Sequence, residues 1–94
     1  MISIADRLQR AMREGNLTVA DLARWLDRPH PTVRGWVNGT KVGAAALDHA
    51  FIIAKLGVLE RLIRKKRELP MPRLSPQQRI AYLATVRKHN IGGK

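Results

Sequence analysis

The sequence predicts an all-α fold in which four to five helices form a compact domain and a hinged helix follows at the C-terminal end. Apolar residues recur at the spacing of one helix face, and Gly, Pro and Asn-Gly separate the segments. No segment alternates polar and apolar residues as a half-buried strand would. A chain of 94 residues is long enough for one core and an extension, and too short for two full domains.

The first expected helix begins near Ile4, with Ser3 as its N-cap, and stops at Gly15-Asn16. Thr18 can cap the second helix, with Asp21 at the N3 position of a weak capping box. Helical spacing predicts that these two helices bury Ile4, Leu8, Ala11 and Met12, and then Leu22, Ala23 and Leu26.

Residues 27–30 form the junction to a short third helix. This helix is expected to run from near Pro31 to Asn38, and Asn38-Gly39 is a strong stop signal. Its buried face is expected to contain Val33, Trp36 and Val37.

A longer apolar stripe predicts one helix over residues 44–68, or two helices broken at Gly57, since Gly costs a helix roughly 1 kcal/mol relative to Ala. The prolines in segment 69–72 end it, because each favours extended geometry in the residue before it. Ser75 then caps a last helix from Pro76 to about His89, which presents Ile80, Leu83 and Val86 on one side.

The charge of the chain is strongly basic and unevenly distributed. The net charge is +11, and residues 41–94 carry twelve of the 18 Lys and Arg but only three of the seven Asp and Glu. Such a charge favours a polyanionic partner, either nucleic acid or an anionic membrane surface. The chain has no cysteine and its three histidines are far apart, so no metal and no cofactor is expected.

The sequence gives little support to an enzyme, a secreted protein or a membrane protein. The acidic residues are scattered, and no Ser-His-Asp arrangement or Gly-rich phosphate loop is recognisable, so we expect neither an enzyme nor a small-molecule substrate. The apolar stretches are interrupted by charges and the N-terminal residues are not organised as a signal peptide. The expectation is a soluble cytoplasmic protein without membrane contact, bacterial or phage-encoded and associated with the nucleoid.

Residues 17–39 carry a pattern of small and apolar residues in the register of two crossing helices. The positions are Leu17-Thr18, Leu22-Ala23, Leu26, Thr32-Val33, Trp36 and Asn38-Gly39. With the later segment 52–58, this pattern resembles the lambda repressor-like (Cro/repressor-type) helix-turn-helix DNA-binding family over residues 1 to about 60. Asp27 and Pro29 stand where the family has Gly and a Ser or Thr cap, and Val19 where it often has a phosphate-contacting Gln.

Helical geometry suggests which side chains of the third helix would face DNA. With Val33, Trp36 and Val37 turned inward, the outward side includes Arg34, His30 and Asn38 as candidate base readers. Arg34 is the strongest of them, because a guanidinium matches two acceptors of guanine. Candidate phosphate contacts are Thr18, Thr32, Thr40, Lys41, Arg61, Arg64, Lys65, Lys66 and Arg67.

The remaining apolar residues suggest self-association. The helix-turn-helix domain is expected to span residues 1–57, and residues 58–94 a basic helical extension with a proline hinge at 69–76. Because the first domain has enough apolar residues to close by itself, an oligomer interface is expected to contain Val58, Leu59, Leu62, Ile63 and Trp25. For Trp25, packing within the chain is an equally supported alternative.

The sequence therefore predicts a DNA-binding protein that binds duplex DNA as a homo-oligomer, either a dimer or a ring. A repressor-like transcriptional regulator is the first expectation. A phage-type small terminase subunit, which recognises DNA for packaging, has a similar size and architecture by analogy. A helical protein-interaction adaptor without sequence-specific DNA reading is the alternative from another class.

Overall fold

Five α-helices make up the chain in the computed structural model, which describes residues 4–39 and 46–90, with side chains from residue 50 onward in the second range. In chain order they are α1 (Ile4–Gly15), α2 (Val19–Leu26), α3 (His30–Asn38), α4 (Ala46–Lys65) and α5 (Pro76–Asn90). No strand occurs in these two ranges. The predicted all-α class is confirmed.

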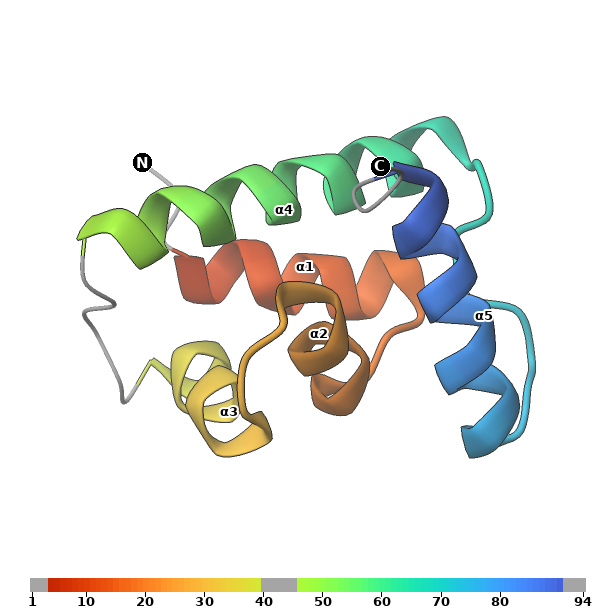
Figure 1. Cartoon of the computed structure of the whole chain (residues 1–94), viewed down its shortest axis with the longest axis horizontal. Coiled ribbons are helices and arrows are strands. Elements are labelled where there is room, and N and C mark those ends of the chain that lie inside the picture. Colours follow the sequence, from red (N-terminus) through yellow and green to blue (C-terminus); the bar gives the residue numbers. More distant parts are fainter. Residues whose placement is uncertain (1–3, 40–45, 91–94) are drawn as a thin grey trace.

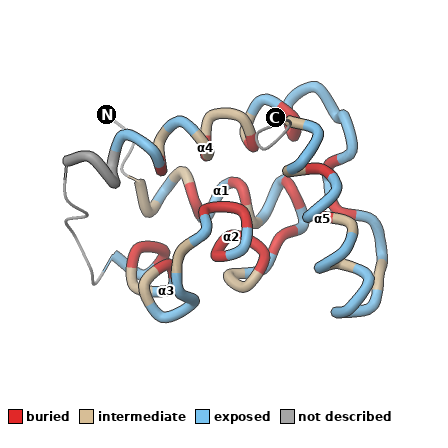
Figure 2. Tube along the Cα trace, viewed as in Figure 1, coloured by how far each residue is buried: buried red, intermediate tan, exposed pale blue. Residues whose placement is uncertain are grey.

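The long helix α4 and the short helix α3 pack on different sides of α1 (Figure 1). Helix α2 contacts α1, α3 and α4, and α5 packs against α2 at the other end of the molecule. The buried residues lie along the parts of the helices that are next to other helices (Figure 2). They form a single hydrophobic core that extends from Leu8 in α1 to Val86 in α5.

Both predicted capping boxes are confirmed. The Asp21 amide donates to Thr18 Oγ1 at 3.1 Å, and the Thr18 amide donates to Asp21 Oδ2 at 2.9 Å. In the same way Ser75 and Gln78 exchange hydrogen bonds of 3.2 and 2.9 Å at the start of α5. The predicted cap Ser3 lies outside the described residues. These caps were predictable because each depends on only four consecutive residues.

Helix α4 is continuous through Gly57 and ends at Lys65, three residues before the expected end. It ends where Lys66 adopts a left-handed backbone with φ of 54°. The expected domain boundary between residues 57 and 58 therefore falls inside a helix. Since one core contains apolar residues from both sides of that boundary, the division into two units is corrected to a single unit.

The proline segment is packed against the core, which corrects the expected hinge at 69–76. Leu69 and Met71 are buried. The Met71 amide donates to the Gly15 carbonyl at 2.8 Å, and Asn16 Nδ2 donates to the Met71 carbonyl at 2.8 Å. Together with the burial of Leu69 and Met71, these two hydrogen bonds hold the segment against the end of α1.

Helix α5 docks on α2 through apolar and ionic contacts. Leu83 and Val86 are buried as expected, whereas Ile80 is 43% exposed. Arg79 pairs with Asp21, whose residue is only 1% exposed, and Arg87 Nε donates to the Trp25 carbonyl at 3.0 Å. Burial alone would raise the pKa of Asp21, but hydrogen bonds from Arg79 and Thr18 outweigh it and lower that pKa.

Candidate nucleic-acid interface

Helices α2 and α3 are joined by only three residues, 27–29. Asp27 ends α2 in the left-handed conformation, with φ of 57° and ψ of 50°. Its amide donates to the Ala23 and Arg24 carbonyls, and the Arg28 amide also donates to the Ala23 carbonyl at 3.0 Å, so these carbonyls at the helix end are paired. Asp tolerates this conformation better than most side chains, so it can occupy a turn position where Gly is more usual. Two helices joined by so short a turn have the layout of a helix-turn-helix.

The two prolines of the junction are compatible with a complete third helix. Pro29 is the N-cap of α3 without a side-chain hydrogen bond, and Pro31 lies in the first turn. A first-turn residue needs no intrahelical N–H bond, so Pro31 removes no hydrogen bond from the helix. Helix α3 starts at His30, one residue before the expected start, and ends at Asn38 with Gly39 in the left-handed conformation.

Helix α3 has one buried face and one exposed face. Val33, Trp36 and Val37 are buried against α1 and α2, as the sequence predicted. His30, Arg34 and Asn38 are exposed and recur at intervals of four residues, so they form one row that runs beside the buried face. Such a row is about 12 Å long at 1.5 Å per residue. The three candidate base readers therefore share one accessible helix face.

The candidate phosphate contacts near α3 have separate locations. Thr18 is exposed at the start of α2, where its hydroxyl oxygen accepts the capping bond and its hydrogen remains available. Thr32 is partly exposed in the first turn of α3. Thr40 and Lys41 lie outside the described residues.

An open depression lies beside the beginning of α3. It has a volume of about 640 Å³ and its lining includes Arg24, Arg28 and His30. Arg24 Nη1 also pairs with Asp21 Oδ1 at 3.1 Å, and Arg28 Nη1 donates to the Asp27 carbonyl at 2.8 Å. Neither arginine is among the residues predicted from the sequence, although their positions beside the junction are a signal that identifies them.

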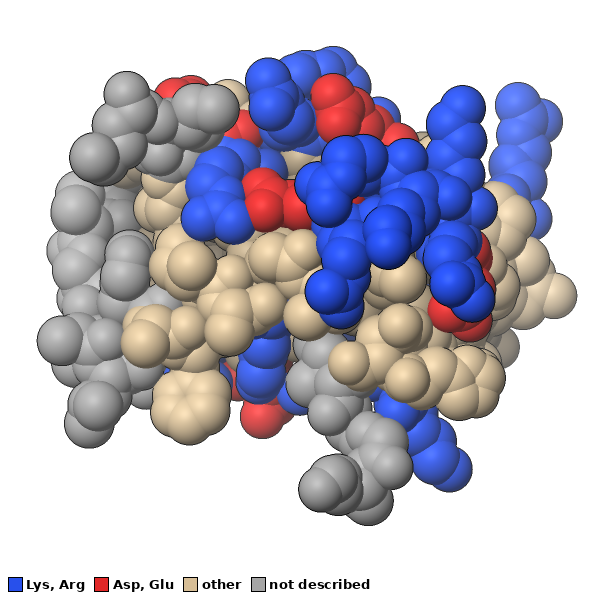
Figure 3. Space-filling view, turned by 90° about the horizontal axis from the view of Figure 1, so that it is seen from above, with Lys and Arg blue, Asp and Glu red and all other residues tan. Residues whose placement is uncertain are grey.

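The other five candidate phosphate contacts lie on a different face of the molecule. Arg61, Arg64, Lys65, Lys66 and Arg67 are all exposed and belong to the end of α4 and the residues after it. Figure 3, which looks down on α4, shows Lys and Arg gathered over its C-terminal part. Because α4 and α3 pack on different sides of α1, these cations do not extend the α3 surface.

Four of the five expected oligomer-interface residues are buried within the chain, which corrects that assignment. Leu59, Leu62, Ile63 and Trp25 are between 0 and 8% exposed, and Val58 is partly buried against the same core. Trp25 Nε1 donates to the Lys55 carbonyl at 2.9 Å. Side chains that are already buried in one copy cannot contact a second copy without unfolding. The alternative for Trp25, packing within the chain, is confirmed.

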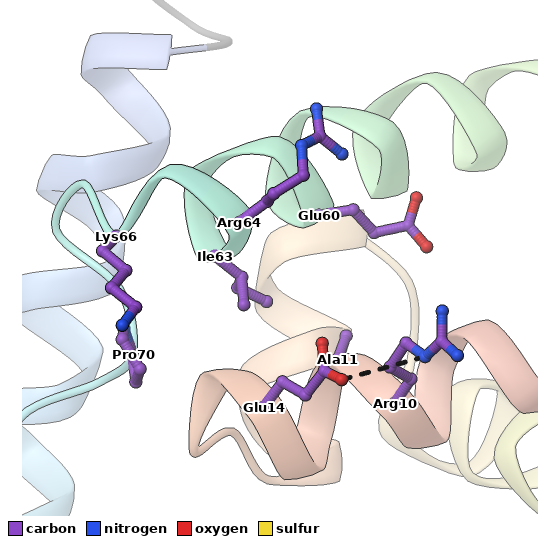
Figure 4. A pocket seen from close by; sticks show the side chains of 8 residues that line it. All are labelled: Arg10, Ala11, Glu14, Glu60, Ile63, Arg64, Lys66 and Pro70. Carbon is purple, nitrogen blue, oxygen red and sulfur yellow. Dashed lines mark ion pairs between the residues drawn. The ribbon is translucent and has the colours of Figure 1, made fainter.

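A groove between α1 and α4 lies next to the α4 cations (Figure 4). It has a volume of about 400 Å³ and is lined by Arg10, Ala11, Glu14, Glu60, Ile63, Arg64, Lys66 and Pro70. Arg10 and Glu14 form an ion pair at 3.9 Å, and Glu60 accepts from Arg7 Nε at 3.0 Å. Acids and bases alternate along this groove, so it does not present a single sign of charge to a small ligand.

Neither a metal site nor a membrane-spanning helix is present in the part of the chain that the structure describes. No group of three or more His, Asp or Glu side chains there could hold a metal ion. None of the described helices combines the length and the apolar character needed to cross a membrane.

Comparisons with protein-family models, with curated proteins and with solved structures find no match for this chain.

Proposed function

We propose that this chain is a helix-turn-helix DNA-binding protein that inserts α3 into the major groove and acts as a repressor-like transcription regulator. The observation that carries the proposal is the exposed row of His30, Arg34 and Asn38 on a helix that is otherwise anchored in the core by Val33, Trp36 and Val37. The major groove is about 12 Å wide and accepts an α-helix, and within the row Arg34 suits guanine and Asn38 suits adenine. The net charge of +11 favours a polyanionic partner of this kind.

The first test is binding of mixed-sequence duplex DNA, followed by fluorescence anisotropy across a salt series. Affinity should fall steeply with salt, because log K decreases by roughly 0.9 per logarithmic unit of salt for each phosphate neutralised. An absence of binding at low salt would exclude DNA reading and leave the protein-interaction adaptor as the better explanation.

The second test addresses specificity. After selection of preferred sequences from a random duplex pool, Arg34→Ala should weaken binding to the selected site by about 1–3 kcal/mol and change binding to mixed-sequence DNA little. Arg73→Ala is the matched control, since it removes an equally exposed cation from the segment between α4 and α5. Equal losses on both duplexes would make Arg34 a phosphate contact and not a base reader.

The role in the cell depends on the assembly on DNA. A regulator of this type binds as a dimer to a two-fold symmetric site, whereas a packaging subunit would form a ring. The mass of the complex with the selected site, measured by light scattering, distinguishes the two.

A further inference from the structure

A group of cations at the end of α4 lies on a different face of the molecule from the α3 row. We define the α4 patch as Arg61, Arg64, Lys65, Lys66 and Arg67. All five are exposed, and none forms an ion pair with an acidic side chain among the described residues. By contrast, Arg7, Arg24 and Arg79 each pair with a carboxylate. No ion pair within the described residues neutralises the α4 patch, although Arg64 and Lys66 border the groove that also contains Glu14 and Glu60.

Helix stability accounts for only part of this patch. Cations in the last turn of a helix interact favourably with its dipole, and Arg64 and Lys65 occupy that turn. Arg61 lies one turn earlier, and Lys66 and Arg67 follow the end of the helix. The Lys66 and Arg67 amides cap the helix by donating to the Ile63 and Leu62 carbonyls at 3.1 and 3.0 Å, but that role requires only their backbone and leaves their charged side chains unexplained.

The α4 patch and the α3 row face different directions. The described residues span 31 × 27 × 24 Å, and α1 lies between α3 and α4 (Figure 1). The major groove is only about 8.5 Å deep, so a duplex that receives α3 does not surround the protein. The phosphates of that duplex do not reach the α4 patch.

We infer that the α4 patch binds the phosphates of a second DNA duplex, so that one copy of the protein bridges two duplexes. This inference rests on the proposed function, because α3 holds the first duplex. An anionic membrane is a poorer partner, since membrane-surface helices insert apolar side chains beside their cations. Leu62 and Ile63, the apolar residues within this segment, are buried in the core.

The test is capture of one duplex by another. A mixed-sequence duplex is fixed to beads, the protein is added, and recovery of a second fluorescent duplex is measured. The patch variant is Arg61→Gln/Lys66→Gln/Arg67→Gln, which keeps both cations of the last helical turn. The α3 variant is Arg34→Glu. Wild-type protein should recover the second duplex, whereas each variant should bind one duplex by anisotropy and recover at least tenfold less of the second.

Two controls make the result specific to charge at these positions. Arg61→Lys/Arg64→Lys/Arg67→Lys retains the charge and should bridge like the wild type. Binding of the second duplex should also depend less on salt in the patch variant. The slope of log K against the logarithm of salt concentration should decrease in magnitude by about 2.7, because three phosphate contacts are lost. Unchanged thermal melting of each variant establishes that it is folded.

Several outcomes overturn the inference and distinguish it from the proposed function. If wild-type protein binds single duplexes but recovers no second duplex, bridging is refuted and DNA binding stands. If the patch variant bridges as well as wild type, the bridge comes from an oligomer and the inference fails. If wild type binds no duplex at all, the proposed function fails first. If the patch variant loses binding to vesicles of anionic lipid but still bridges DNA, the patch serves a membrane instead.

Discussion

Replacing Arg79 with Met should destabilise the fold by about 3 kcal/mol, because it removes the main partner of a buried carboxylate. Asp21 is 1% exposed, and the Arg79 side chain is 17% exposed. Breaking a buried ion pair by removing one partner costs about 3–5 kcal/mol. Here Arg24 still pairs with Asp21 at 3.1 Å, so we expect a value at the low end of that range. A small domain has only about 5–15 kcal/mol of total stability, so the loss should be obvious.

Urea unfolding at neutral pH, followed by circular dichroism, gives the free energy of unfolding for each variant. Arg24→Met is the matched control. Its side chain is 39% exposed, and removing an exposed ion pair should cost no more than about 1 kcal/mol. The double variant Asp21→Asn/Arg79→Met should recover part of the loss, because a neutral amide is less costly to bury than a carboxylate. Similar small losses for Arg79→Met and Arg24→Met would refute the reasoning.

Three other predictions concern stability and can be checked by thermal or urea unfolding. Gly57→Ala should stabilise the protein by about 1 kcal/mol, because Gly57 lies in an unbroken helix and an added Cβ meets no atom within 4 Å. Gly15→Ala should destabilise it, because the added Cβ would lie 2.8 Å from Ile63 Cδ1. Asp27→Gly should stabilise by about 0.5–1 kcal/mol, because Gly adopts the positive φ of 57° without steric cost; a loss would indicate a role for the carboxylate. The lowered pKa of Asp21 means that its stabilising contribution is present above the ordinary pKa of 3.8 and is lost as pH falls further, so the stability difference between wild type and Asp21→Asn should shrink in acid.

Features that depend on a few neighbouring residues could be predicted from the sequence. The capping boxes of α2 and α5 are examples, because each needs only four residues. The exposed row on α3 was also predictable, since the choice of buried face follows from helical spacing once Val33, Trp36 and Val37 are placed inside. Whether that row reads DNA stays a prediction.

Features that depend on distant parts of the chain could not be predicted in the same way. The periodicity of Leu59, Leu62 and Ile63 indicates a helix face that must be covered, but not whether α1, α5 or a second copy covers it. The docking of Met71 depends on hydrogen bonds with Gly15 and Asn16, which are distant in the sequence, so the prolines beside it indicated the end of α4 but not a packed segment. The pair between Asp21 and Arg79 joins residues 58 positions apart, and no local pattern indicates it.

The separation of charge from the α3 row has a physical consequence for any DNA complex. Contacts to bases provide specificity, whereas contacts to phosphates provide most of the affinity and its dependence on salt. On the described part of α3 only Arg34 is cationic, whereas the α4 patch contains five cations on another face. A protein organised in this way would recognise sequence with one surface and retain DNA with another. Neutralising the α4 patch should therefore weaken capture of a second duplex whatever its sequence, and changing the α3 row should alter the ranking among sequences.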